Sequence, residues 1–347
     1  MRNILEKLFF ANDYNCICHP KVLEKLGEIN LTPRPGYGTD EETALASKKI
    51  LEACGIPEGG VYYCAGGTQA NMICISWLLK ADYMGAVCAR TGHIGCHEAG
   101  AVEATGHKVL LLPEEGDKVT AAGLKRYLEN FFRDGSWDHF VQPGMVYLSF
   151  PTEFGSLYTK QELTDIYGVC REYKLPLFID GARLGYALAS PACDLTLKDL
   201  PKLCDVFYIG GTKVGALFGE AIVFPKGLPF FFHTHAKNKG ALLAKGFACA
   251  AQFDALFTDD LYLKISRRAV DMAFRMKKGF LDKGLQLYID SLTNQQFVVL
   301  SDEAYEKISE KVVCEKWEKP DETHTVVRFA VSWSTREEDI DRLLELL

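Results

Sequence analysis

Seven short apolar segments between residues 60 and 225 constrain the fold more than any other feature of this sequence. Several are nearly continuous in hydrophobicity rather than alternating, which is typical of strands buried on both faces of a sheet. Stretches of helical length and periodicity lie between them, as at 121–132 and 160–173. This alternation predicts an α/β domain with a mostly parallel, seven-stranded sheet. The predicted strands are Val61–Ala65, Ala86–Ala89, Lys108–Leu112, Met145–Phe150, Leu175–Ile179, Val206–Ile209 and Ala221–Phe224.

The pattern changes near Phe231. Residues 239–287 have long helical character, short strands follow at 296–300 and 325–332, and the chain closes with a helix at 336–347. These features predict a smaller α+β domain at the C-terminal end. A chain of 347 residues also exceeds the usual size of one domain. We expect an N-terminal segment at 1–30 that packs with the small domain, a large α/β domain at 31–230 and the small domain at 231–347.

Composition and charge exclude several classes of protein. The formal net charge of -7 argues against a nucleic-acid partner, because phosphate backbones are bound by basic surfaces. No apolar stretch approaches the roughly 20 residues that span a bilayer, and the first residues lack a secretory pattern. The twelve cysteines are scattered without a Cys-x-x-Cys pair, so we expect reduced thiols rather than disulfides or a metal site. A cytoplasmic enzyme without nucleic-acid or membrane partners is the resulting expectation.

Three segments of the predicted α/β domain carry chemistry. In the first, a strand runs into Gly66 and Gly67, then Thr68 and an apolar helix at 72–79. Glycines let backbone N–H groups approach an anion, and a helix N-terminus attracts one. The same pattern also occurs in ordinary strand-to-helix turns. It is neither a dinucleotide fingerprint nor a P-loop, which argues against a nucleotide-dependent enzyme.

In the second segment an apolar strand ends in Asp180, and Arg183 follows three residues later. Ligands of α/β sheets bind beyond the carboxyl ends of the strands. There Asp180 could pair with a protonated ring nitrogen, and Arg183 could bind a carboxylate bidentately. A local salt bridge between Asp180 and Arg183 is the alternative.

In the third segment Lys213 lies between two strand-like runs, among glycines and apolar residues. Burial lowers the pKa of a lysine and favours Schiff-base chemistry. Taken alone, such a lysine is more often a surface residue. Together with the other two segments, the interpretation as a buried, reactive lysine is favoured. Together the three segments predict an enzyme that holds pyridoxal-5'-phosphate (PLP) as a Schiff base on Lys213.

In their order and spacing, these segments resemble the threonine aldolase/β-eliminating lyase family of fold-type I PLP-dependent enzymes. The resemblance extends from Asn12 to Arg328 and is most specific at residues 180–183 and 210–213. It implies a PLP-dependent transferase-like fold and a homodimer or homotetramer with interfacial active sites. The basic residues that could reach a partner's cofactor phosphate are Lys237, Lys239 and Lys245.

The resemblance also implies roles for individual residues. Lys213 would carry the cofactor, Asp180 would keep its ring nitrogen protonated, and His93 would stack on its ring. The cofactor-binding residues would be Gly67, Thr68, Gln69, His93, Asp180, Arg183 and Lys213. The substrate-binding residues would be Asn12, His97, Arg183 and Arg328. Without the family context, both histidines would be interpreted as partly buried and satisfied by hydrogen bonds.

Two positions depart from the family pattern. Family members commonly carry a serine where this chain has Asn12, and a second active-site histidine where this chain has Glu153. The loop at 151–155 resembles a low-specificity branch of the family. The predicted catalytic residues are Lys213, His93, Glu153 and Asp180. The base remains open between His93, Glu153 and a water that they orient.

The reaction implied by the resemblance is retro-aldol cleavage of a β-hydroxy-α-amino acid, such as L-threonine or L-allo-threonine, to glycine and an aldehyde. A PLP-dependent β-eliminating lyase or aminotransferase on the same scaffold is the nearest alternative, because the cofactor and lysine are common to all three. A catalytically silent protein with this fold is a further alternative. The presence of Lys213, Asp180, Arg183 and Arg328 weighs against it.

Overall fold

In the computed structural model, which describes residues 7–113 and 116–347, the seven apolar segments form one sheet. Its strand order is β2-β8-β7-β6-β5-β3-β4. Only β8 runs antiparallel to its neighbours, and the other pairs are parallel. The mostly parallel seven-stranded sheet is therefore confirmed. The strands are β2 (Gly60–Cys64), β3 (Met84–Cys88), β4 (Lys108–Leu111), β5 (Gln142–Ser149), β6 (Leu177–Asp180), β7 (Val206–Gly210) and β8 (Glu220–Phe224).

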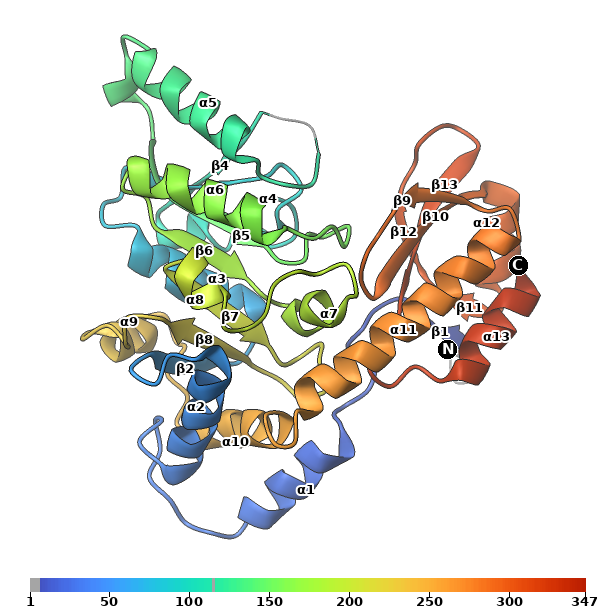
Figure 1. Ribbon diagram of the computed structural model, residues 1–347, viewed down its shortest axis with the longest axis horizontal. Helices are drawn as coiled ribbons and strands as arrows, with labels where there is room; N and C mark the ends of the chain where they lie inside the picture. The colour runs from blue at the N-terminus through green and yellow to red at the C-terminus, as the bar shows by residue number, and fades with distance from the viewer. Residues whose placement is uncertain (1–6, 114–115) are drawn as a thin grey trace.

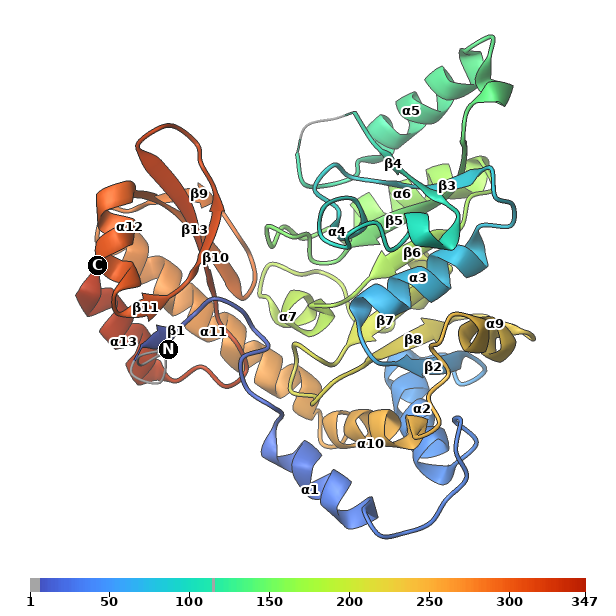
Figure 2. The same ribbon diagram turned by 180° about the vertical axis from the view of Figure 1, so that it is seen from behind.

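Helices cover both faces of this large sheet (Figure 1), and α3 lies on the face turned to the viewer in Figure 2. The central strands are consequently buried on both sides. Val206 and Tyr208 of β7 face one apolar core, and Phe207 and Ile209 face the other. This two-sided burial explains the continuous hydrophobic runs in the sequence. The helices around the large sheet are α2 (Glu41–Cys54), α3 (Gly67–Leu78), α4 (His93–Cys96), α5 (Ala121–Arg133), α6 (Lys160–Glu172), α7 (Leu184–Ala189), α8 (Leu200–Leu203), α9 (Phe232–Asn238) and α10 (Gly246–Leu256).

A smaller, antiparallel sheet lies in the C-terminal part of the chain, in the order β12-β13-β10-β9. It packs against α11 and α12, so the predicted α+β C-terminal region is confirmed. The helical stretch expected at 239–287 is interrupted, because Asp259 and Asp260 adopt left-handed backbone angles between α10 and α11. The elements are α11 (Leu261–Asp282), β9 (Gln286–Ile289), β10 (Gln295–Ser301), α12 (Asp302–Ser309), β12 (Glu315–Glu318), β13 (His324–Ala330) and α13 (Glu337–Leu346).

The N-terminal segment crosses between the two parts. Strand β1 (Leu8–Phe9) pairs in parallel with β11 (Val312–Val313), whereas α1 (Pro20–Ile29) packs on α10 beside the large sheet. Residues 1–6 of the expected N-terminal segment lie outside the described residues. The domain limits at 30 and 230 stay a prediction. We note that α9 and α10, which follow the second limit, pack on α3 and α2 rather than on the small sheet.

Two glycines bring the ends of β6 and β7 together. A methyl group on Gly181 would overlap the carbonyl oxygen of Tyr208, and one on Gly210 would overlap that of Ala182. The backbone N–H of Gly210 donates to the carbonyl of Gly181 at 2.9 Å. The segments after β6 and β7, which carry the second and third chemical motifs, therefore lie side by side.

Among the described residues, none of the helices combines the length and hydrophobicity needed to cross a membrane.

We predict that Gly181→Ala destabilises the protein, because its side chain would overlap the backbone of β7. Overpacking of this kind costs about 1–3 kcal/mol, which should lower Tm by about 1–4 °C in thermal unfolding followed by circular dichroism. Gly168→Ala is the matched control. Gly168 is exposed on α6 with open space around it, so alanine there should preserve or raise Tm. Equal Tm values for the two variants would contradict the prediction.

Candidate active site

Asp180, at the carboxyl end of β6, is the centre of a buried polar cluster. Its Oδ2 accepts hydrogen bonds from Tyr147 Oη at 2.6 Å and Asn71 Nδ2 at 3.0 Å. Its Oδ1 accepts from Tyr208 Oη at 2.5 Å and from the backbone N–H of Ala182 at 3.0 Å. Burial alone would raise the pKa of Asp180, but nearby His93 and the donated hydrogen bonds bring it below its ordinary value. The site thus holds a carboxylate anion.

Helix α3 and the segment around α4 extend this cluster. Asn71 Nδ2 also donates to Glu98 Oε1 at 2.7 Å, and Glu98 Oε1 lies 2.9 Å from His93 Nδ1. The backbone N–H of His93 donates to Glu153 Oε1 at 2.8 Å. His93 is therefore fixed at its backbone by one glutamate and at its ring by another.

Lys213 lies in the loop between β7 and β8. Its backbone carbonyl accepts a hydrogen bond from Tyr186 Oη at 2.6 Å, which anchors the loop. Burial, together with the positive charge of Arg183, lowers the pKa of Lys213, although Asp13, Asp180 and Glu220 partly offset this. Burial raises the pKa of Glu220, which stands on β8, to about 8. A lysine in these surroundings is more readily deprotonated, and so more nucleophilic, than a lysine in water.

The N-terminus of α3 provides backbone donors close to Asp180. Gly66, its first flanking residue, is extended and offers no side-chain cap to the helix. Side-chain contacts of Gln69 go to the protein's own backbone: Oε1 accepts from Ala65 N–H at 2.9 Å, and Nε2 donates to the Gly240 carbonyl at 3.4 Å. The backbone N–H groups of the first turn, from Gly67 to Gln69, are the donors that a helix leaves without internal partners.

The two arginines predicted to bind a substrate carboxylate both lie near the cavity, and both contact acidic side chains. Arg183 pairs with Asp13, with Nε and Nη2 at 2.7 and 3.0 Å from its carboxylate, and not with Asp180. The alternative of a local Asp180–Arg183 salt bridge is therefore wrong. Burial would raise the pKa of Asp13, but Arg183 outweighs it and the value falls to about 2. Asn294 Nδ2 also donates to Asp13, at 2.9 Å.

Arg328, on β13, is held by three groups. Nη1 donates to Gln295 Oε1 at 2.9 Å, Nη2 donates to the carbonyl of Ala11 at 2.9 Å, and Nη2 also pairs with Glu315. The guanidinium lies 5.1 Å from the ring centre of Trp317. Burial and the positive charge of Arg183 lower the pKa of Arg328. Its Nε is buried without a hydrogen-bond partner.

Glu153 is almost fully buried beside His93. Ser149 Oγ donates to its Oε1 at 2.5 Å. Burial raises the pKa of Glu153 to about 7, despite the hydrogen bond from Ser149. A carboxyl group with this pKa can exchange a proton near neutral pH.

Of the two remaining predicted substrate contacts, His97 lies beside His93, and Asn12 precedes Asp13, the partner of Arg183. The side chain of Asn12 accepts a hydrogen bond from the backbone of Tyr14 at 3.2 Å, so it caps a local turn. The ring of His97 lies 5.6 Å from that of His93 and 5.8 Å from that of Trp317. Burial and the neighbouring His93 lower the pKa of His97.

One small cavity brings together five of the predicted site residues from separate parts of the chain. It is lined by His93, Ser149, Pro151, Thr152, Glu153, Asp180, Ala182, Arg183 and Lys213. Their roles stay predictions. Sequence reasoning did not assign Asn71, Tyr147, Tyr208 or Glu98, which complete the polar cluster. The only sequence signal for Asn71 is a polar side chain within the apolar run of α3.

The residues present fit PLP. Asp180 is an anionic carboxylate suited to a protonated pyridine nitrogen, and the α3 N-terminus is suited to a phosphate. Lys213 is a half-buried amine with a lowered pKa, suited to an aldehyde. A methyl group on Gly67 would come within 3.0 Å of Tyr208 Oη, so the first turn of α3 passes close to the cluster around Asp180.

Comparisons with known proteins agree with this geometry. The family model described as Beta-eliminating lyase matches residues 22–303. A low specificity L-threonine aldolase from Pseudomonas aeruginosa is 30% identical over 350 residues, covering 97% of this chain and 95% of that protein. The solved threonine aldolase of Leishmania major is 38% identical with a TM-score of 0.93, covering 97% of this chain and 98% of that one. Serine palmitoyltransferase of Sphingomonas wittichii shares the fold at 12% identity, with a TM-score of 0.72 over 98% of this chain and 86% of that one.

We predict that Lys213 is the lysine that reacts with PLP, because its surroundings favour the uncharged amine. After addition of PLP and reduction with borohydride, peptide mass spectrometry should find the pyridoxyl group on Lys213. Lys213→Ala should lose both the modified peptide and the visible absorbance of the bound cofactor. Lys202→Ala is the control. Lys202 is exposed on α8, so this variant should be labelled at Lys213 and absorb light in the same way as the native protein. Specific labelling of another lysine, unaffected by Lys213→Ala, would contradict the prediction.

Proposed function

This chain belongs to the β-eliminating lyase family, and from that premise we propose that it is a PLP-dependent aldehyde-lyase of the low-specificity L-threonine aldolase type. The resemblance noted at residues 180–183 and 210–213 is confirmed by the family match and by threonine aldolases of high coverage. The proposed reaction cleaves a β-hydroxy-α-amino acid to glycine and an aldehyde. The observation that carries it is the buried cavity in which Lys213, Asp180, Arg183 and Glu153 meet.

PLP, when bound, supplies an electron sink for the bond that breaks at the α-carbon of the substrate. We propose that Lys213 holds it, that the N–H groups of Gly67, Thr68 and Gln69 bind its phosphate, and that His93 lies over its ring. Asp180 would pair with the ring nitrogen. Its low pKa supports this role, because a carboxylate that stays ionised keeps a nearby ring nitrogen protonated.

Arg183 and Arg328 are proposed to orient the substrate through its α-carboxylate, with Asn12 and His97 beside them. Asp13 would hold Arg183 in place from behind, leaving Nη1 for the substrate. Orientation decides which bond at the α-carbon is aligned for cleavage. Two fixed cationic groups therefore favour one reaction among those that PLP permits.

Glu153 is proposed to take the proton from the β-hydroxyl oxygen, alone or together with His93. Its carboxylate shares the cavity with Lys213 and Arg183. A pKa of about 7 leaves a large fraction ionised at neutral pH and still makes it a stronger base than an exposed glutamate. Glu153 would then act as the base at the position where family members commonly carry a second active-site histidine.

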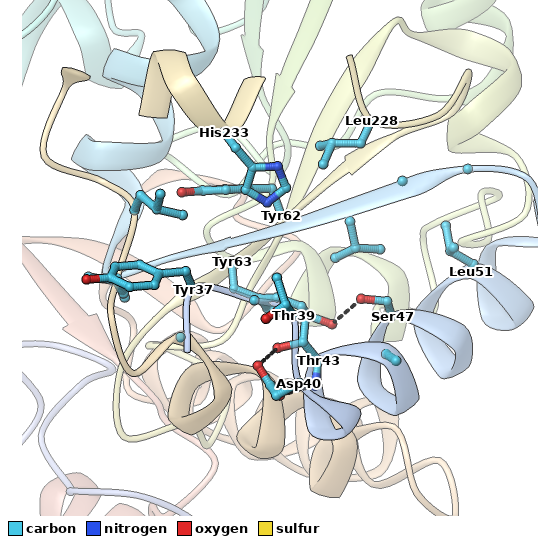
Figure 3. A pocket seen from close by; sticks show the side chains of 18 residues that line it. Tyr37, Thr39, Asp40, Thr43, Ser47, Leu51, Tyr62, Tyr63, Leu228 and His233 are labelled. Atoms are coloured by element: carbon cyan, nitrogen blue, oxygen red, sulfur yellow. Dashed lines mark hydrogen bonds between the residues drawn. The ribbon is translucent and has the colours of Figure 1, made fainter. Parts of the chain in front are cut away.

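A second copy of the chain is proposed to cover the face near α9, as a homodimer or half of a homotetramer. Phe230 and Phe231 are 91% and 62% exposed there, and large exposed apolar side chains are typical of interfaces. A cavity of about 420 Å³ beside them, with Tyr37, Tyr62 and His233 in its wall, opens at this face (Figure 3). Light scattering that gives the mass of one chain would contradict this assembly.

The basic side chains close to that face support an interfacial site. Lys237 Nζ lies 5.1 Å from the ring centre of Tyr37, and Lys239 and Lys245 lie on the same stretch between α9 and α10. In a dimer one of them would reach the partner's cofactor phosphate, since phosphates are bound by cationic groups.

The experiment that tests the reaction incubates the PLP-loaded protein with L-threonine, L-allo-threonine and 3-phenylserine. We predict equimolar glycine and aldehyde, because the proposed carboxylate clamp and base would favour cleavage of the bond between the α-carbon and the hydroxyl-bearing β-carbon. Glycine, aldehyde, 2-oxo acid and ammonia are assayed together, with Lys213→Ala as the blank. A 2-oxo acid with ammonia and no glycine would instead assign a β-eliminating lyase, and a 2-oxo acid that requires an amino acceptor would assign an aminotransferase.

We predict that Glu153 controls the acid side of the pH profile. Its raised pKa means that lowering the pH through about 7 protonates the carboxylate and removes the base, so kcat should fall. Glu153→Gln should lower kcat by about 100-fold or more and remove this acid limb. Glu162→Gln, on α6 away from the cavity, should keep the native profile. An unchanged acid limb in Glu153→Gln would assign the base to another group.

A further inference from the structure

Four polar side chains form a continuous chain of hydrogen bonds from the buried Asp180 to the partly exposed His93. Asn71 Nδ2 donates to Asp180 Oδ2 at 3.0 Å and to Glu98 Oε1 at 2.7 Å, and Glu98 Oε1 lies 2.9 Å from His93 Nδ1. Both partners of the Asn71 amide are carboxylates, which only accept hydrogen bonds when ionised. The orientation of Asn71, with Nδ2 between them, follows from this chemistry.

The same rule determines which nitrogen of His93 carries the proton. An ionised Glu98 cannot donate, so His93 Nδ1 must be the donor of the 2.9 Å hydrogen bond. In a neutral imidazole the other nitrogen, Nε2, is then unprotonated and can accept a proton. His93 lines the cavity together with Lys213 and Glu153, so this nitrogen belongs to the proposed site.

We propose that Glu98 is a positioning residue that holds His93 in the Nδ1-protonated tautomer and keeps Nε2 free to accept a proton beside Glu153. Asn71 holds Glu98 in place and shares its amide with Asp180, so one amide group fixes both the carboxylate that would pair with the ring nitrogen and the glutamate that holds His93. This inference rests on the proposed function for the placement of the cofactor ring. The contact between Glu98 and His93 does not depend on it.

A purely structural role explains Glu98 poorly. Its side chain is fully buried, and its Oε2 has no hydrogen-bond partner. Within the described part of the chain, no lysine or arginine pairs with it, and its only ion-pair contact is His93. Burying a carboxylate in this way is costly, and well-packed apolar residues often replace buried charges without loss of stability. The cost is explained if the carboxylate is needed to accept the hydrogen bond from His93 Nδ1.

Other charged groups face His93, but none is placed to choose its tautomer. Glu153 accepts from its backbone N–H rather than its ring. Asp180, Arg183 and Lys213 line the same cavity, and the ring of His97 lies tilted beside that of His93, at 5.6 Å between ring centres. Among the described residues, only Glu98 makes a hydrogen bond with the ring of His93.

The test measures the tautomer directly by ¹⁵N NMR of histidine-labelled protein, with and without PLP, using His93→Asn to assign the signal. We expect His93 to be protonated at Nδ1 in the native protein. Glu98→Met, which removes the acceptor at similar size, should shift the ring towards protonation at Nε2, as in free histidine. Glu98→Gln keeps an acceptor oxygen and should restore the native tautomer. A neutral ring protonated at Nε2 in the native protein would overturn the proposal, whether or not the variants fold.

Kinetics give a second readout. Glu98→Met should lower kcat for the proposed cleavage by about 100-fold while KM changes less than about threefold, and Glu98→Gln should stay within about tenfold of native kcat. Asp254→Asn is the control for lost stability. Asp254 is another buried carboxylate, on α10, and pairs with Lys25 and Lys49 rather than with residues of the cavity. Native kcat in Glu98→Met would overturn the positioning role. A native protein with the expected tautomer but no glycine production would instead refute the proposed function and leave the role of Glu98 standing.

Discussion

The arrangement of this site depends on the burial of one negative charge. A carboxylate at the end of β6 is destabilising in an apolar interior unless several donors surround it. Asp180 obtains those donors from β5, β7, α3 and its own following turn, through Tyr147, Tyr208, Asn71 and Ala182. The hydrogen bonds that stabilise this single carboxylate therefore hold four segments of the chain together around Asp180. The loop that carries Lys213 starts from one of them.

The sequence predicts those parts of the molecule that follow from local pattern. Two-sided burial makes the strands of the large sheet visible as apolar runs, and parallel strands end at one edge, which brings Asp180 and Lys213 together. Glycines at 181 and 210 mark where two backbones approach. Contacts between distant segments have no such signature. Asp13 meets Arg183 across 170 positions, and Arg328 meets the carbonyl of Ala11 across 317. Neither pairing follows from periodicity or composition.

Charge compensation links the cavity to both parts of the fold. Arg183 belongs to the large sheet and Arg328 to the small one, and two cations so close together repel each other. Asp13 and Glu315 offset that repulsion, the first from the N-terminal segment and the second from β12. An incoming carboxylate would add a further negative charge between the two arginines. Each arginine is therefore neutralised by an acidic side chain from a different part of the chain.

The pairing of β1 with β11 has a consequence for the order of events at the ribosome. Leu8 is among the first described residues to be synthesised, yet its partner Val312 emerges some 300 positions later. Strands of the large sheet can pair in the meantime, because their partners lie nearer in sequence. Asp13 lies four residues after β1, so the segment that holds Arg183 is anchored at one end by a strand that is synthesised late. Nascent protein would consequently gain the core of its large sheet before β1 can pair and before the segment that carries Asp13 is anchored.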